Sequence, residues 1–137
     1  MQHGENSIMF KNIAAGVCVT LLAVVCAGCG KTGPARYEIS GNVSYNGMPL
    51  PAGTISFDPV GQEMGGGFAS IENGQYDTEK GGRGHLGGKH LVTIVGTDGK
   101  RLNPNDPDSG MKSLFQPYET EVDLPTSKGT QDFEVPE

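Results

Sequence analysis

Alternating apolar and polar positions recur from residue 37 to the end of the chain and predict short β-strands. In the stretch 37–45, Ile39, Val43 and Tyr45 fall on one face, and the positions between them are mostly polar. A period of two is the pattern of a strand with one buried face. With the inward residues in parentheses, the same pattern predicts strands at 53–59 (Ile55, Phe57), 68–72 (Phe68), 75–79 (Tyr76), 119–124 (Val122, Leu124) and 130–135 (Phe133, Val135).

Turn signals separate these segments and indicate how the strands connect. Asn46-Gly47 and Asn73-Gly74 each predict a hairpin turn, because both residue types tolerate positive φ. Residues 90–95 are apolar on both faces, which is typical of a central strand covered on both sides. Further predictions are a turn at 97–100, glycine-rich loops at 60–67 and 81–88, a loop at 103–110 and one helical turn at 111–115. The whole pattern favours an all-β fold, an antiparallel sandwich of seven or eight strands.

The N-terminal part has a different character. Ile13 to Ala27 is an uncharged apolar run flanked by Lys11 and Lys31, which predicts an apolar signal helix. The run is shorter than the roughly 20 residues that a membrane-spanning helix needs. An ordinary signal peptide or a single membrane anchor are the alternative interpretations. Met1 and Met9 both remain candidate initiators, and Met9 gives the more typical start of a signal.

Cys29 directly follows two small residues, Ala27 and Gly28. This arrangement resembles the lipobox of bacterial lipoproteins, with Cys26 where that motif usually has leucine. In that family the cysteine thiol receives a diacylglycerol and becomes the first residue of the mature protein. The resemblance implies export to the cell envelope, periplasmic or on the outer surface, and a membrane anchor that carries palmitate. It divides the chain into a signal peptide (1–28), a tether (29–36) and a β-domain (37–137).

The composition supports one exported domain. Cleavage before Cys29 leaves 109 residues, which hold all nine Pro and 19 of the 22 Gly. All three cysteines lie at or before residue 29, so the β-domain has no internal disulfide. The part after cleavage carries 15 acidic and 9 basic side chains, a net of −6. A surface of this sign is unsuited to nucleic acid, because neutralising phosphates requires clustered Lys and Arg.

Two clusters invite a metal interpretation, and both have a simpler explanation. His85 and His90 lie near Arg83 and Lys89, but their spacing is not typical of a metal site, and a solvated loop is the expected state. The second cluster offers oxygen ligands for calcium in a loop without the pattern of an EF-hand, so plain turns are the alternative. The calcium candidates are Asn103, Asn105, Asp106 and Asp108.

Catalytic motifs do not emerge from the sequence. A Gly-x-Ser-x-Gly elbow and a His-x-x-Glu zinc motif are both absent, and the glycine runs are not followed by Lys-Ser or Lys-Thr. Tyr45 and Tyr76 suit the core better than a sugar-stacking face, and the chain has no Trp. Glu119, Glu121 and Asp123 fit a solvated strand face that discourages edge-to-edge aggregation. We therefore expect no catalytic residues and no cofactor.

The segment from Gly41 to Phe57 has the form G-x-V-x-x-x-G-x-P-L-x-x-G-x-I-x-F. Together with Asn73-Gly74-Gln75-Tyr76 and the strand 88–94, it resembles carboxypeptidase regulatory-like domains. The resemblance implies a transthyretin-like (prealbumin-like) sandwich and carries no chemistry. The expected function is that of a non-enzymatic, lipid-anchored envelope protein with a structural, adhesive or protein-binding role. The alternative is a module that binds a glycan or peptide for a separate envelope enzyme.

Overall fold

The computed structural model describes residues 33–62 and 65–137, and its longer strands occur where the sequence alternates. Among the described residues these are β1 (Ile39–Tyr45), β3 (Ala52–Pro59), β4 (Gly67–Glu72), β7 (Gly88–Arg101) and β9 (Tyr118–Leu124). The shorter elements are β2 (Met48–Pro49), β5 (Gln75–Asp77), the helical turn α2 (Thr78–Gly81), β6 (Gly82–Arg83), β8 (Met111–Ser113), β10 (Gly129–Thr130) and β11 (Phe133–Val135). The expected signal helix lies outside the described residues.

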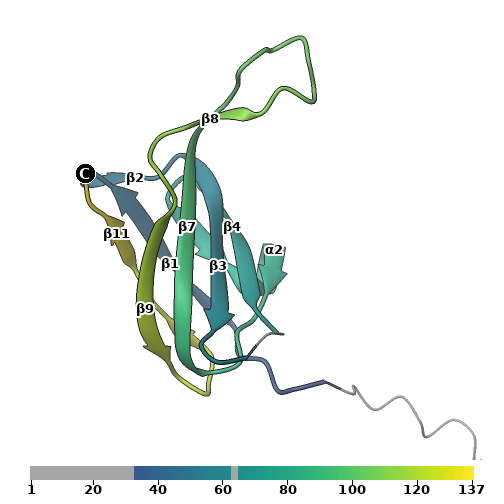
Figure 1. The fold of residues 1–137 in the computed structure, drawn as a ribbon, viewed down its shortest axis with the longest axis vertical. Helices are drawn as coiled ribbons and strands as arrows, with labels where there is room; N and C mark the ends of the chain where they lie inside the picture. The colour runs from purple at the N-terminus through teal and green to yellow at the C-terminus, as the bar shows by residue number, and fades with distance from the viewer. Residues whose placement is uncertain (1–32, 63–64) are drawn as a thin grey trace, which may run out of the picture. The chain divides into compact units, whose positions relative to one another are not determined.

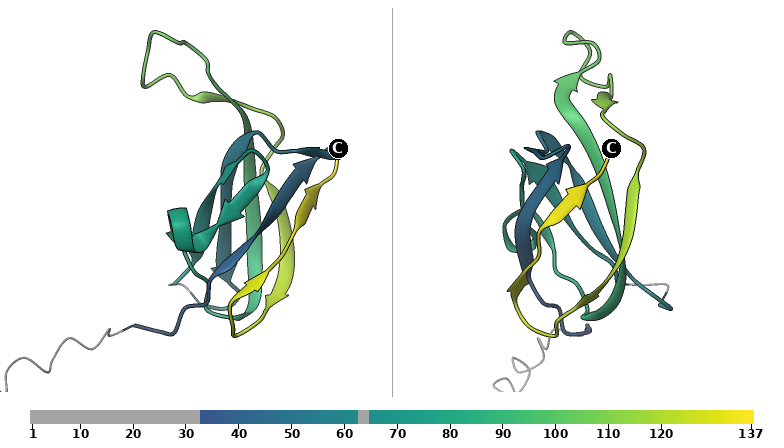
Figure 2. Two further views of the ribbon diagram at one scale, coloured as in Figure 1. Left: turned by 180° about the vertical axis from the view of Figure 1, so that it is seen from behind. Right: turned by 90° about the vertical axis from the view of Figure 1, so that its left-hand side faces the viewer.

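The strands form one continuous ladder in the order β10-β1-β5-β4-β3-β7-β8, with β11 also on β1 and β9 also on β7. Most neighbours are antiparallel, as expected, but β10 and β11 run parallel to β1. The ladder curls over so that β1 and β11 lie across the core from β3 (Figures 1 and 2). The ring centroids of Phe57 on β3 and Phe133 on β11 are accordingly 6.5 Å apart. β9 and β11 do not pair with each other, so the described part of the ladder does not close into a barrel.

The core is built from the inward positions of the alternating segments. Ile55 and Phe57 are fully buried, as are Val92 and Ile94 on the neighbouring strand β7. The predicted inward positions Ile39, Val43, Tyr76, Leu124, Phe133 and Val135 are buried too, and Tyr45 and Val122 pack partly buried against them. Apolar burial of this kind is the main force that holds such a fold together. The prediction from strand periodicity is confirmed at these positions.

Both predicted Asn-Gly turns have the backbone that their residue types favour. The φ angles are 53° at Asn46 and 71° at Gly47, and 51° at Asn73 and 76° at Gly74. Two successive positive φ angles match the right-handed twist of the flanking strands. These turns join β1 to β2 and β4 to β5, and they are confirmed.

Several strand details differ from the prediction. Phe68 is 45% exposed, because Ala69 and Ile71 take the inward positions of β4. The return strand expected at 75–79 ends at Asp77, whose side chain accepts the N–H of Glu79 and caps the helical turn α2. β7 is paired on both sides, as expected of a central strand. Its outer face is not covered, however, since Val95 is 38% exposed.

The segment after residue 96 forms an arm instead of a turn and a helix. β7 runs on to Arg101 through an irregular register, and Met111 pairs with Arg101 at the start of β8. The edge of β7 supplies partners for the backbone of Met111–Ser113, which explains why the expected helical turn at 111–115 does not form. The turn-forming residues 103–110 connect the two strands at the end of the arm, which projects beyond the body (Figures 1 and 2). The expected turn at 97–100 and helical turn at 111–115 are wrong.

Candidate functional site

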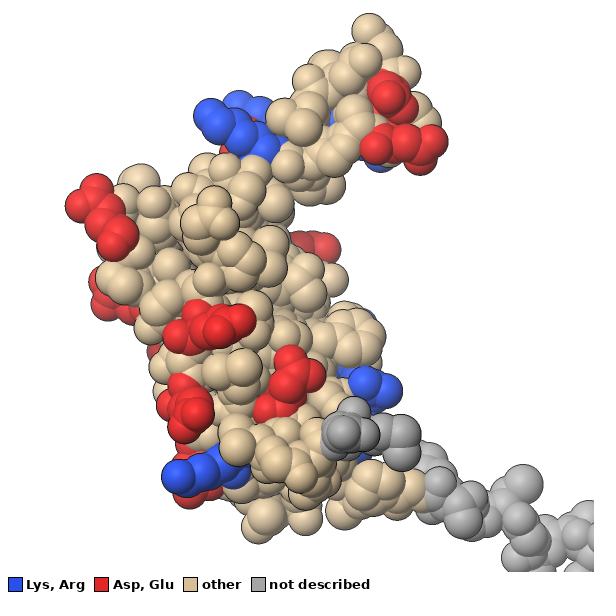
Figure 3. All heavy atoms as spheres, in the orientation of Figure 1, with Lys and Arg blue, Asp and Glu red and all other residues tan. Residues whose placement is uncertain are grey.

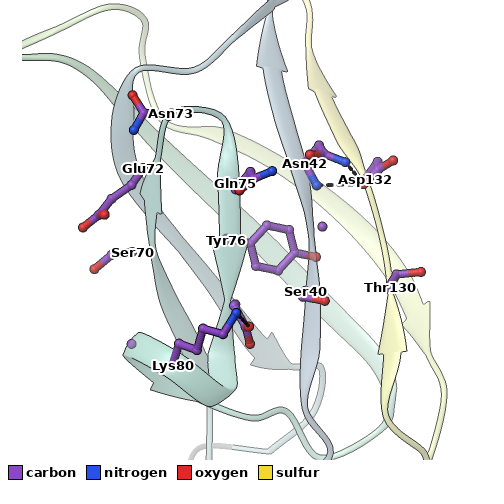
Figure 4. A pocket seen from close by; sticks show the side chains of 13 residues that line it. Ser40, Asn42, Ser70, Glu72, Asn73, Gln75, Tyr76, Lys80, Thr130 and Asp132 are labelled. Carbon is purple, nitrogen blue, oxygen red and sulfur yellow. Dashed lines mark hydrogen bonds and ion pairs between the residues drawn. The ribbon is translucent and has the colours of Figure 1, made fainter.

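An open groove of about 780 Å³ lies on the outer face of β1, β5 and β4 (Figure 4). Alternation places the polar residues of these strands outside, so most of the side chains that line the groove are polar. β10 and the turn α2 complete its walls. The lining residues are Ser40, Gly41, Asn42, Ser70, Glu72, Asn73, Gln75, Tyr76, Asp77, Lys80, Gly81, Thr130 and Asp132.

A hydrogen-bond network fixes the wall where the C-terminal segment runs alongside β1. Asp132 Oδ1 accepts the backbone N–H of Asn42 at 2.7 Å and its side-chain Nδ2–H at 3.1 Å. Figure 4 shows both contacts. The Tyr76 hydroxyl donates to the carbonyl oxygen of Gln131 at 2.7 Å. Burial raises the pKa of Tyr76 far above its ordinary value, and the negative charge of Asp132 adds to this. Tyr76 therefore acts as a neutral hydrogen-bond donor and not as a base.

Gly41 allows the backbone of Gln131 to approach β1 this closely. A Cβ at position 41 would lie 2.0 Å from the carbonyl oxygen of Gln131, far inside van der Waals contact. The backbone of Gln131 also donates to Ser40 O at 2.9 Å. A side chain at position 41 would push the segment between β10 and β11 away from β1.

One ion pair marks the α2 side of the groove. Lys80 Nζ lies 3.3 Å from Asp77 Oδ2. Partial burial opposes ionisation of Asp77, but the N–H of Glu79 and the ammonium of Lys80 outweigh it and lower its pKa. On the neighbouring surface Glu79 accepts a hydrogen bond from Lys128, which raises the pKa of Lys128. These charges shape the surface, and neither pair is buried enough to hold an unusual protonation state.

Other groove side chains have no hydrogen-bond partner among the described residues. They are the hydroxyls of Ser40, Ser70 and Thr130, the carboxylate of Glu72 and the amide of Gln75, drawn in Figure 4. Together they offer donors and acceptors spread over a shallow polar floor. This chemistry suits recognition of a hydroxyl- or amide-rich ligand. Sequence reasoning missed this site, although the polar half of each alternating strand was its visible signal.

His85 and His90 form the most unusual cluster of the domain. Both side chains are fully buried, and their ring centroids lie 5.6 Å apart in an edge-to-face contact. The expectation of a solvated loop is therefore wrong. The cause is a long-range contact: Tyr37 and His85 form an isolated antiparallel bridge that draws the glycine-rich segment against the core. Arg83 does not join the pair, since it is exposed and its guanidinium lies 5.8 Å from the centre of the Phe68 ring.

Backbone contacts assign a different tautomer to each imidazole. The N–H of Gly87 points at His85 Nδ1, 3.0 Å away, so the proton of the neutral ring sits on Nε2. His90 Nδ1 lies 2.9 Å from Gly88 O and donates to it, so Nε2 carries the lone pair. A metal ion needs a lone pair on each ligand nitrogen. The His85 tautomer does not provide one at Nε2, and no group of three or more metal-ligating side chains occurs within residues 33–62 and 65–137.

The oxygen-rich loop at 103–109 uses its side chains on its own backbone. Asn103 Oδ1 accepts the N–H of Asn105 at 3.1 Å, and Asp106 Oδ1 accepts the N–H of Asp108 at 2.9 Å. The Ser109 hydroxyl bridges the N–H and carbonyl of Asn103. Such contacts are typical of Asx turns. The four calcium candidates therefore lie together in one exposed loop, at the end of the arm.

Cys29, the lipidation candidate, lies outside the described residues. Within residues 33–62 and 65–137, no helix is long and apolar enough to cross a bilayer.

Comparisons with protein-family models, curated proteins and solved structures found no match to this chain.

Proposed function

We propose that the chain is a lipid-anchored protein of the cell envelope that acts by binding and not by catalysis. The observation that carries this proposal is the apolar run Ile13–Ala27 ending at Ala27-Gly28-Cys29, directly before a compact unit that begins at Pro34. Because small residues before a cysteine suit cleavage and acylation there, Cys29 is the proposed lipidation site.

The tether between Cys29 and the domain is short. Arg36 Nη1 donates to the carbonyl oxygens of Gly65 and Gly84 at 2.9 and 2.7 Å, so the chain is fixed to the body from Arg36 on. Residues 30–35 reach about 20 Å even when fully extended. The domain would therefore work close to the membrane.

The arm supports a protein-binding role. Residues 34–36 join the body at one end, and the arm projects from the opposite end (Figure 1). Figure 3 shows basic atoms where the arm leaves the body and acidic atoms toward its tip. Leu102 and Met111 on the arm are 68% and 50% exposed. An anchored domain would thus present exposed apolar and charged side chains away from its tether.

The fold is compatible with the carboxypeptidase regulatory-like resemblance. Leu50, from the Pro49-Leu50 step of that pattern, is fully buried. Gly53 is needed because a Cβ there would lie 2.2 Å from the carbonyl oxygen of Val95. A transthyretin-like sandwich is the form that we propose for the domain. The features that match the pattern are structural, which fits a structural, adhesive or protein-binding role.

Replacing Cys29 tests the anchor. In the native host, wild-type protein should fractionate with membranes and incorporate radiolabelled palmitate, and Cys29→Ala should lose the label. Cys26→Ala is the matched control, since it removes a thiol three residues away and should keep the label. Palmitate incorporation into Cys29→Ala, or a wild-type protein that is exported without lipid, would refute the anchor.

The groove favours a second candidate function, binding of a glycan or peptide for a separate envelope enzyme. Its unpartnered hydroxyl, amide and carboxylate groups can exchange water for ligand hydrogen bonds. Glycan arrays and peptide libraries should then give a ligand whose affinity falls when Ser70 and Gln75 are changed to Ala. Gln116→Ala, an exposed change outside the groove, is the control. If Gln116→Ala loses as much affinity as the Ser70 and Gln75 changes, the ligand does not bind in the groove.

A further inference from the structure

The His85–His90 pair is buried beneath the point where the tether joins the body. The backbones of Tyr37 and His85 bond to each other twice, at 2.9 and 3.0 Å. The Tyr37 ring lies 6.0 Å from the His85 ring. Arg36, one residue earlier, bonds to Gly84 O and Gly65 O. Arg36 and Tyr37 therefore form a cap over the histidine pair, called here the tether cap.

Neither imidazole is fully satisfied. His85 Nε2 and His90 Nε2 are buried and have no hydrogen-bond partner among the described residues. Buried polar atoms are nearly always paired, so two orphan nitrogens in contacting rings require a reason. The assigned tautomers leave one N–H donor on His85 and one lone pair on His90. His90 Nε2 is thus the position at which the pair takes up a proton.

The charges around the pair give little compensation for such a proton. Glu38 at the start of β1 is the nearby acid; it accepts a hydrogen bond from the Thr78 hydroxyl. Arg36 contributes a positive charge, and Asp58 on β3, Lys89 on β7 and Asp123 on β9 are exposed. Burial lowers the pKa of His85, His90 lowers it further and Glu38 partly opposes both.

We propose that His85 and His90 form a proton-sensitive switch that releases the tether cap in acid. A proton on His90 Nε2 gives both rings an N–H at Nε2 and places a charge in the core. Movement of His85 outward separates the two N–H groups and opens the charged His90 ring to water, and it breaks the Tyr37–His85 bridge and the Arg36 contacts. The β3–β7 ladder does not depend on that bridge and stays intact. Glu38 stays bonded to Thr78 and Gly129. Freeing Arg36 and Tyr37 lengthens the tether by about 7 Å.

Amide exchange on the full chain in detergent micelles tests the switch. Between pH 7.5 and pH 5, the protection of the Tyr37 and His85 amides, corrected for intrinsic rates, should fall by about tenfold per pH unit below the midpoint for one linked proton. The amides of Ile55 and Ile94 should keep their protection. A uniform loss at all four amides would mean global acid unfolding and would overturn the proposal, as would unchanged protection at Tyr37 and His85.

Variants and nitrogen chemical shifts add an independent readout. His90→Gln should weaken the dependence of the Tyr37 protection on pH, whereas Lys89→Gln, an exposed neighbour, should respond like wild type. If His90→Gln does not fold, imidazole ¹⁵N shifts of the wild type decide. At neutral pH one of the pair must be protonated at Nε2 and the other at Nδ1. The same tautomer in both rings, or an undiminished pH response in His90→Gln, would contradict the switch. None of these results depends on whether Cys29 is lipidated.

Discussion

Gly41→Ala should destabilise the domain more than its size suggests. The added Cβ would lie 2.0 Å from Gln131 O, and that atom belongs to backbone, which cannot rotate away. The segment 131–132 must then move off β1. Its hydrogen bonds there run from the Gln131 N–H to Ser40 O, from the Tyr76 hydroxyl to Gln131 O and from the Asn42 N–H to the Asp132 carboxylate.

The expected magnitude follows from opposing effects. Overpacking at a tight site costs about 1–3 kcal/mol, and each weakened hydrogen bond adds about 0.5–1.5 kcal/mol. Replacing Gly by Ala returns about 0.4–1 kcal/mol, because the unfolded chain becomes less flexible. The free energy of unfolding should therefore fall by about 2 kcal/mol or more, which corresponds to a Tm lower by about 8 °C or more.

Urea and thermal unfolding followed by circular dichroism measure this loss. Gly110→Ala is the matched control, because no atom lies within 4 Å of a Cβ at that position. It should change stability by less than about 0.5 kcal/mol. If Gly41→Ala is as stable as Gly110→Ala, the backbone of Gln131 does not lie against Gly41 as described.

Three further changes probe the core, the groove wall and the histidine pair. Phe57→Ala should cost about 3–5 kcal/mol in urea unfolding, whereas Phe68→Ala should cost less than about 1 kcal/mol because that ring is largely outside; equal losses would contradict the assigned faces of β3 and β4. Tyr76→Phe should lower the free energy of unfolding by about 1 kcal/mol, and a neutral result in the same assay would remove the hydroxyl's role in holding Gln131. Burial and His90 lower the pKa of His85 from the ordinary 6.5, and Glu38 opposes them only in part. Below pH 6.5 the unfolded state therefore binds more protons than the folded state. Stability should be constant above pH 6.5 and should fall by up to about 1.4 kcal/mol per pH unit below it. Urea titrations at pH 7.5, 6.5 and 5.5 measure the slope, and His85→Asn with an undiminished slope would exclude this residue as its source.

Local signals account for what the sequence predicted well. The turns at Asn46-Gly47 and Asn73-Gly74 depend on two residues each, and the inward positions of β1, β3 and β9 follow from alternation within one strand. The arm was missed because pairing of Met111 with β7 involves residues ten apart, and this pairing overrides a weak helical preference.

Long-range placement explains why the candidate site was missed. Ser40 and Gln75 were recognisable as outward and polar, whereas the inward assignment of Phe68 put Ser70 on the wrong face. Only the order β1-β5-β4 brings the three residues to one groove. The burial of His85 depends on the bridge to Tyr37, 48 residues earlier in the chain. A glycine-rich stretch with charged neighbours gives no signal of such a contact.

The central claim is that Cys29 carries the lipid that places this domain at a membrane. Intact-mass analysis of protein extracted from the membranes of the native host tests it most directly. The account predicts a chain that begins at Cys29 and carries the added mass of a diacylglycerol that includes palmitate. A chain of unmodified mass, whether it begins at Met1, at Met9 or at another cleavage position, would contradict it.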